Sequence, residues 1–84
     1  MDTEKFHALA KEGLVKKIAE SFPEEGVTVS DIYVVWTCKI LQNNKAMLST
    51  DKLHGHYYEV THNGDKNELY IDMYEKASNT CVHI

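Results

Sequence analysis

The spacing of apolar residues changes at Pro23, and this change of period constrains the fold more than any other feature of the chain. Before Pro23, apolar residues recur every three or four positions, which is typical of a helix with one buried face. These residues are Phe6, Leu9, Ala10, Leu14, Ile18 and Phe22. From Ile32 onward the spacing becomes two, which is typical of strands. We therefore predict an amphipathic helix over residues 3–22, followed by a sheet.

The predicted helix carries signals at its ends and in its middle. Asp2 or Thr3 can accept hydrogen bonds from the first free N–H groups. Pro23 ends the helix because it pushes the preceding residue out of helical geometry. Gly13 lies in the interior, where glycine costs about 1 kcal/mol relative to alanine. This cost predicts a close approach to another element at Gly13, and the alternative is a tolerated exposed position.

The segment 32–50 is predicted to form a first hairpin. Its first half is rich in β-branched and aromatic residues, which favours a central strand. One set of alternate residues is expected on the core side: Ile32, Val34, Trp36, Cys38 and Ile40. The other set is expected on the opposite side: Tyr33, Val35, Thr37, Lys39 and Leu41.

Local signals flank this strand. Thr28 and Asp31 have the spacing of a capping box, which predicts one short helical turn before the strand. Asn43-Asn44 is the expected turn after it, because asparagine tolerates the positive φ values of a type I′ turn. That turn places Ile40 opposite Met47 and Cys38 opposite Ser49.

The segment 56–75 is predicted to form a second hairpin, for which two turns compete. A turn centred on Asn63-Gly64 places Glu59 opposite Glu68, and such a like-charge pair is destabilising. A turn centred on Gly64-Asp65 places Glu59 opposite Tyr70 instead, and we favour it. Both registers give the same faces, because they differ by an even number of residues.

Each face of the second hairpin therefore has a predicted membership. The residues expected to face the core are His56, Tyr58, Val60, Leu69, Ile71 and Met73. The residues expected to face outward are Tyr57, Glu59, Thr61, Glu68, Tyr70, Asp72 and Tyr74. The whole chain, residues 1–84, is then one α+β domain in which an N-terminal amphipathic helix packs on a four-stranded antiparallel β-meander. Residues 77–84 form a tail, of which the last residues, Cys81–Ile84, either extend a sheet edge or fray.

The charged residues of the chain argue against two classes of binding partner, nucleic acids and membranes. The chain has thirteen acidic and nine basic residues, a net charge of −4, and no arginine. Arginine supplies the bidentate contacts used on phosphates and guanine, so this composition argues against nucleic-acid binding. The lysines are scattered, which also argues against a membrane-binding patch. The first residues carry charges and no cleavage site, so we expect an intracellular protein with both cysteines reduced.

Histidines and cysteines at short spacing suggest one possible metal site. The pairs His54/His56 and Cys81/His83 are each separated by one residue, with Cys38 and His62 elsewhere. Residues that are two positions apart on a strand lie on the same face, and imidazole and thiolate groups together suit zinc. The alternative is ordinary surface histidines, which we favour, and we expect no cofactor. Because Cys38 is expected in the core, and no phosphate loop or nucleophile motif is present, we do not expect an enzyme.

The outward face of the second hairpin is the candidate binding site. Tyrosine is enriched at protein interfaces, and interleaved acids suit a partner with a basic surface. The candidate residues are Tyr57, Glu59, Glu68, Tyr70, Asp72 and Tyr74. The alternative is a solvated face, since tyrosine is also common in strands without any partner.

Two strings, YVVWTCKILQNNKAMLST and YYEVTHNGDKNELYIDMYEK, resemble a family of small proteins of unknown function encoded by phages and prophages of Gram-positive bacteria. The resemblance runs from about Ser30 to Lys76. It implies a phage protein in the host cytoplasm, with no catalytic residues to carry over. Proteins of this kind are similar to inhibitors of host enzymes or of bacterial immunity, including anti-CRISPR and anti-restriction proteins. The expected function is a protein-binding module, and the alternative is a homodimeric structural or regulatory phage protein.

Overall fold

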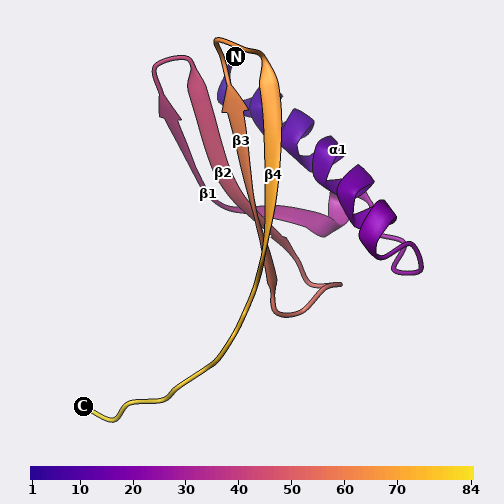
Figure 1. Ribbon diagram of the computed structural model, residues 1–84, viewed down its shortest axis with the longest axis vertical. Helices are drawn as coiled ribbons and strands as arrows, with labels where there is room; N and C mark the ends of the chain where they lie inside the picture. The colour runs from indigo at the N-terminus through magenta and orange to yellow at the C-terminus, as the bar shows by residue number, and fades with distance from the viewer.

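The computed structural model describes all residues, 1–84, as one helix on a four-stranded sheet (Figure 1). The elements in chain order are α1 (Thr3–Ser21), the short 3-10 helix η1 (Val29–Asp31), β1 (Ile32–Ile40), β2 (Asn43–Thr50), β3 (His56–Asn63) and β4 (Glu68–Glu75). All neighbouring strands are antiparallel, in the order β1-β2-β3-β4. The predicted α+β meander is therefore confirmed, with the helix ending one residue before the predicted boundary. No helix is long and apolar enough to cross a bilayer.

The helix α1 begins at a side-chain cap. Asp2 Oδ1 accepts a hydrogen bond from the backbone N–H of Lys5 at 2.7 Å, so Asp2 is the cap residue. The buried stripe of α1 is narrow, with members four residues apart: Phe6, Ala10, Leu14 and Ile18. Leu9 lies beside this stripe and is exposed, contrary to the sequence pattern. A stripe this narrow covers only the middle of the sheet.

The core lies between α1 and one face of the sheet. Its strand residues come mainly from the two central strands, and they are Ile32, Ala46, Leu48, Tyr58 and Val60. On β4, Leu69 and Ile71 pack against the core from the edge. Gly13 makes this approach possible, because a Cβ there would lie 3.0 Å from Leu69 Cδ2. The predicted close contact at Gly13 is confirmed. Met73, which was expected to face the core, is exposed near the end of the edge strand β4.

A β-bulge in β1 overturns the predicted faces of that strand. Val34 pairs with Leu48 and Trp36 pairs with Met47, so Val35 is an extra residue. An extra residue reverses the alternation beyond it. Ile32 and Val34 face the helix as expected, but Trp36, Cys38 and Ile40 face the opposite side and are exposed. Thr37 and Lys39 take the helix side instead, opposite Ala46 and Asn44. The expected core position of Cys38 is wrong, and β1 is an edge strand rather than a central one.

The first turn lies two residues earlier than expected. Ile40 pairs with Asn43, so the loop is Leu41-Gln42, with Leu41 at a φ of 55°. Asn43 instead accepts a hydrogen bond through Oδ1 from Gly64 N at 3.0 Å, and Gln42 Nε2 donates to Asp65 Oδ1 at 2.7 Å. Contacts between the two hairpin tips thus override the local turn preference of Asn43-Asn44. The expected pairs Ile40 with Met47 and Cys38 with Ser49 do not form.

The second hairpin adopts neither of the two predicted registers. Asn63 pairs with Glu68, leaving a four-residue loop over residues 64–67 in which Asn67 has a φ of 52°. Asn63 Oδ1 accepts from the backbone N–H groups of Asp65 and Lys66, which stabilises this wider turn. The observed register differs from both predicted ones by an even number of residues. The predicted faces of β3 and β4 are therefore retained.

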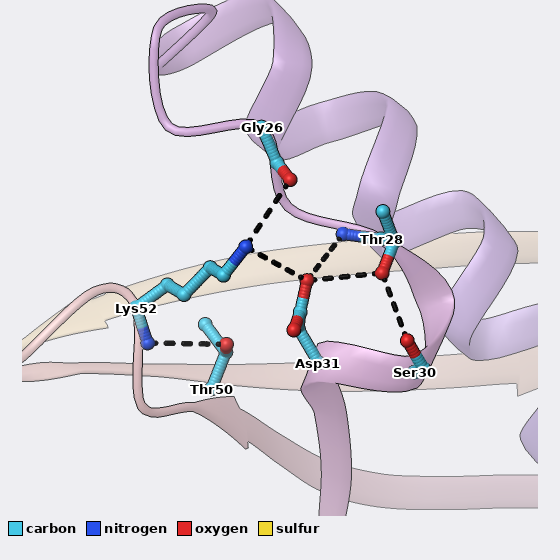
Figure 2. Close-up of polar contacts among 6 residues, drawn as sticks. All are labelled: Gly26, Thr28, Ser30, Asp31, Thr50 and Lys52. Carbon is cyan, nitrogen blue, oxygen red and sulfur yellow. Dashed lines mark hydrogen bonds and ion pairs between the residues drawn. The ribbon is translucent and has the colours of Figure 1, made fainter.

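A polar junction joins η1 to the loop after β2 (Figure 2). Asp31 Oδ2 accepts from the backbone N–H of Thr28 at 2.8 Å and from its hydroxyl at 3.0 Å, consistent with the expected short helical turn. Lys52 Nζ lies 3.3 Å from the same carboxylate oxygen and donates to Gly26 O at 3.4 Å. The hydrogen bonds from the backbone and the hydroxyl of Thr28 lower the pKa of Asp31, and the hydrogen bond and charge of Lys52 lower it to a smaller extent. The junction fixes the entry into β1.

Candidate functional site

The sheet has one covered face and one open face. Side chains alternate between these two faces along each strand. The helix α1 lies over one face only (Figure 1). We call the side opposite α1 the outer face. It combines an acidic, tyrosine-rich stripe on β3 and β4 with an apolar trough that reaches across to β1.

All six candidate residues from the sequence lie on the outer face, on the two strands β3 and β4. We call them the acid-tyrosine stripe: Tyr57, Glu59, Glu68, Tyr70, Asp72 and Tyr74. Tyr57 lies directly opposite Tyr74, and Glu59 lies directly opposite Asp72. The three tyrosines are between 42% and 49% exposed, so each leaves a large area free for contact. The structure thus brings together residues that are up to 17 positions apart in the sequence.

The acids of the stripe have different surroundings. Glu59 faces Asp72 across the strands, a like-charge arrangement that is unfavourable by itself. Lys45 on β2 offsets it, with Nζ 3.2 Å from Glu59 Oε1. Glu68 accepts a hydrogen bond from the Tyr70 hydroxyl at 2.9 Å. That bond, and the negative charge of Glu68, raise the pKa of Tyr70. Asp72 has no basic partner and faces solvent, so it is available to a partner.

The trough is the part of the outer face that sequence reasoning missed. It is an open hollow of about 410 Å³ with side chains from all four strands around it. Those that matter most are Trp36, Cys38, Ile40, Lys45, Thr61 and Tyr70. Large side chains on the edge strands form its rims, and shorter ones on the central strands form its floor. It exists because the bulge at Val35 turns Trp36, Cys38 and Ile40 outward. The sequence of β1 does not reveal this bulge, because Val34 and Val35 are the same residue type and either could face the core.

The histidines and cysteines considered as metal ligands are spread over the molecule. His56 lies 3.5 Å from Glu75 Oε1 and beside the ring of Phe22, while its Nδ1 contacts His54 O. His62 is buried under the helix side of the sheet and contacts Asn67 through Nε2 at 3.0 Å. Cys38 lies in the trough, and Cys81 lies in the tail, both as free thiols. The structure gathers no three potential metal ligands at one place.

The exposed side chains of the outer face offer both contact area and charge. Partly exposed aromatic side chains supply contact area at low entropic cost, and free carboxylates supply charge selectivity. Exposed apolar residues on a monomer are usually scattered singly, whereas several exposed aromatic residues lie together on this face. The outer face therefore has the composition of a binding surface.

Comparison with known proteins concerns nearly the whole chain. A model of a family of unknown function, DUF6275, matches residues 7–84. No curated protein and no solved structure matches the chain. The matched stretch includes most of α1, the complete sheet and the tail. The chain therefore belongs to the family of unknown function DUF6275.

Proposed function

We propose that this chain is a non-enzymatic protein-binding module that places its acid-tyrosine stripe against a basic surface of another protein. The observation that carries the proposal is the gathering of three exposed tyrosines and three carboxylates on one uncovered sheet face. Residues 57–75 contain five acids and one lysine, so the field over this part of the sheet is negative. Such a field favours basic partners and rejects acidic ones.

The resemblance of both hairpin strings to small phage and prophage proteins suggests where the partner is found. We infer a protein that acts in the host cytoplasm and inhibits or modulates a host or defence protein, in the manner of anti-CRISPR or anti-restriction proteins. Support comes from the acidity of the chain and from its open, tyrosine-rich sheet face. The second candidate is a homodimeric structural or regulatory phage protein with no host target, which the open apolar part of the outer face favours.

The test reverses charge in the stripe and follows capture of a partner. The Glu68→Lys/Asp72→Lys variant changes two exposed carboxylates without touching the Lys45–Glu59 ion pair. Glu12→Lys/Glu20→Lys on exposed positions of α1 is the matched control, with the same change in net charge. The host protein captured by the parent chain is identified and purified, and its affinity for each variant is measured. We expect about tenfold or greater weakening for the stripe variant, which corresponds to ~1.4 kcal/mol, and little change for the control.

Salt gives an independent reading of the same contact. Because the stripe is exposed, its attraction to a basic surface is screened as ionic strength rises, and the association rate falls most. Equal affinity of the parent chain and the stripe variant for the same partner would contradict the proposal. Equal weakening by the stripe and α1 variants would show that only net charge matters.

A further inference from the structure

The chain exposes more surface than a compact protein of its mass. A folded 9.6 kDa monomer exposes about 5,100 Å² by the usual scaling with mass, whereas this chain exposes 5856 Å². Its radius of gyration is 14.0 Å, against about 12 Å for a compact chain of this length. The excess area is close to the ~800 Å² that each partner buries in a standard interface. The tail contributes to this excess, because every residue after Lys76 is exposed.

The tail, residues 77–84, leaves the body of the protein completely. Lys76 N donates to Gly55 O at 2.8 Å, and every residue after Lys76 is exposed. Figure 1 shows the tail running on from β4, away from the sheet and from the hairpin tips. Its last five residues, Thr80–Ile84, are rich in β-branched side chains, and Val82 is 74% exposed. The match to the family model extends through residue 84 and so covers the tail.

The trough has the shape and charge to hold such a segment. Its rims stand on β1 and β4, three strand spacings or about 14 Å apart, which leaves room for one extended chain. Trp36 and Ile40 form the apolar rim and are 41% and 65% exposed. Lys45 is the one charged side chain that lines it, and Glu59 already neutralises this lysine at 3.2 Å. An uncharged, apolar strand therefore fits the trough better than a charged one.

We propose that two copies of this chain exchange tails, so that Thr80–Ile84 of each copy lies in the trough of the other. Val82 and Ile84 cover Trp36 and Ile40, and the exchange is reciprocal, as in a two-fold symmetric dimer. A second copy is favoured over the chain's own trough by where the tail starts. The trough lies at the hairpin-tip end of the sheet, whereas β4 ends at Glu75 beside His56, at the other end. Self-insertion would require a reversal followed by a return of about 17 Å along the sheet.

Native cysteines test the arrangement directly, since Cys38 lies in the trough and Cys81 lies in the tail. Equal amounts of ¹⁴N- and ¹⁵N-labelled chain are mixed, equilibrated and treated with a short bismaleimide, and the linked peptides are identified by mass spectrometry. We expect a Cys38–Cys81 link in which half the products join peptides of different isotope. Cys38→Ser and Cys81→Ser should each abolish that link. Links confined to peptides of one isotope would show self-insertion and overturn the proposal, as would links between like cysteines alone.

Oligomeric state tests the same proposal without cross-linking. Light scattering should give twice 9.6 kDa for the parent chain, and Val82→Asp/Ile84→Asp should weaken the dimer at least tenfold. The monomeric variant should have the same melting temperature as the parent chain diluted until it is monomeric, because residues 77–84 do not pack against the helix or the sheet of their own chain. Ser78→Asp/Asn79→Asp, outside the docking segment, is the matched control. A parent chain with a monomer's mass, or an unaffected dimer in the Val82/Ile84 variant, overturns the proposal. Asp72→Lys, which changes a stripe residue that neither lines the trough nor contacts its lining through a hydrogen bond, should leave the dimer intact, and this separates the result from the test of partner binding.

Discussion

Gly13 is a single position on which the contact between α1 and β4 depends. A Cβ at this position would lie 3.0 Å from Leu69 Cδ2 and 3.3 Å from Ile71 Cδ1. Both neighbours are ends of flexible side chains, so a methyl group needs only a small adjustment. A larger side chain would have to displace the edge strand.

Gly13→Ala is therefore expected to stay within about 1 kcal/mol of the parent, because a gain in helix propensity offsets the small clash. Gly13→Val should cost ~1–3 kcal/mol through overpacking. Urea denaturation followed by circular dichroism measures both. Ala19→Val, at an exposed position of α1, controls for the lower helix propensity of valine. A Gly13→Val loss no larger than that of the control would contradict the close contact.

Tyr70 reports on the state of the acid-tyrosine stripe. Its hydroxyl donates to Glu68, and that bond with the charge of Glu68 raises the pKa of Tyr70 above its ordinary value of 10.0. In Glu68→Gln the charge is gone, so the pKa of Tyr70 should fall toward 10.0. A titration of the tyrosine ring carbons by NMR measures the change. Tyr74, opposite Tyr57 and away from Glu68, serves as the internal control. An unmoved Tyr70 would show that the hydrogen bond does not persist in solution.

At the scale of elements, β1 shows what the sequence can and cannot predict. Its strand type follows from β-branched and aromatic residues and is correct, but the strand ends at Ile40, two residues before the expected end at Gln42. Its faces are wrong beyond Val34, because a bulge reverses the alternation and leaves no mark in the composition. The predicted faces of the second hairpin are correct even though its predicted register is wrong. Its register was wrong by an even number of residues, so each side chain kept its face.

Deletions separate the bulge from the regular part of β1. Deleting Val35 removes only the extra residue, so Val34 and Trp36 keep their partners on β2. Deleting Thr37 instead forces Trp36 onto the helix side, or turns Ile32 and Val34 outward. We expect the Val35 deletion to fold with a modest loss of stability, and the Thr37 deletion to cost ~3 kcal/mol or more. Thermal unfolding measures both, and equal losses would contradict the assigned bulge.

The junction at Asp31 gives the element scale a pH dependence. A carboxyl group whose pKa is lowered by folding binds fewer protons in the folded state, so it stabilises the fold above its ordinary pKa of 3.8. That stability is lost as the pH falls through the folded pKa. Asp31→Asn should therefore lower the melting temperature at pH 7, and the difference from the parent should shrink as the pH falls below the ordinary pKa of 3.8. Asp51→Asn, on the exposed loop after β2, removes one carboxylate outside this junction and is the control. A constant difference at all pH values would contradict the hydrogen bonds in Figure 2.

At the scale of the whole molecule, period and charge were enough for the fold class but not for the site. The change of spacing at Pro23 gave one helix and four strands in the right order. The acid-tyrosine stripe was also placed on the uncovered face. The trough could not be predicted from the sequence, because it depends on the bulge at Val35 and on contacts between Gln42 and Asp65 at the hairpin tips. Long-range contacts of this kind have no local sequence signal.

Trp36 is the single tryptophan of the chain and lies on the rim of the trough. If tails are exchanged, its ring leaves water on dimerisation, so its fluorescence emission should move to shorter wavelength as the protein concentration rises. The Val82→Asp/Ile84→Asp variant should show no such movement. A fluorescence titration across the dissociation constant measures both. Emission that does not change with concentration in the parent chain would place Trp36 outside the self-association surface.

The order of the strands also has a consequence for synthesis. Each strand pairs with the next one along the chain, so hairpins can close locally and quickly. The helix comes first, however, and the residues that bury its apolar stripe include Tyr58 and Val60, on β3. At ribosomal speeds of 5–20 residues per second, the gap from Ser21 to Asn63 lasts roughly 2–8 s. During those seconds the apolar stripe of α1 has no β3 residues to pack against, so its burial must wait for synthesis of the second hairpin.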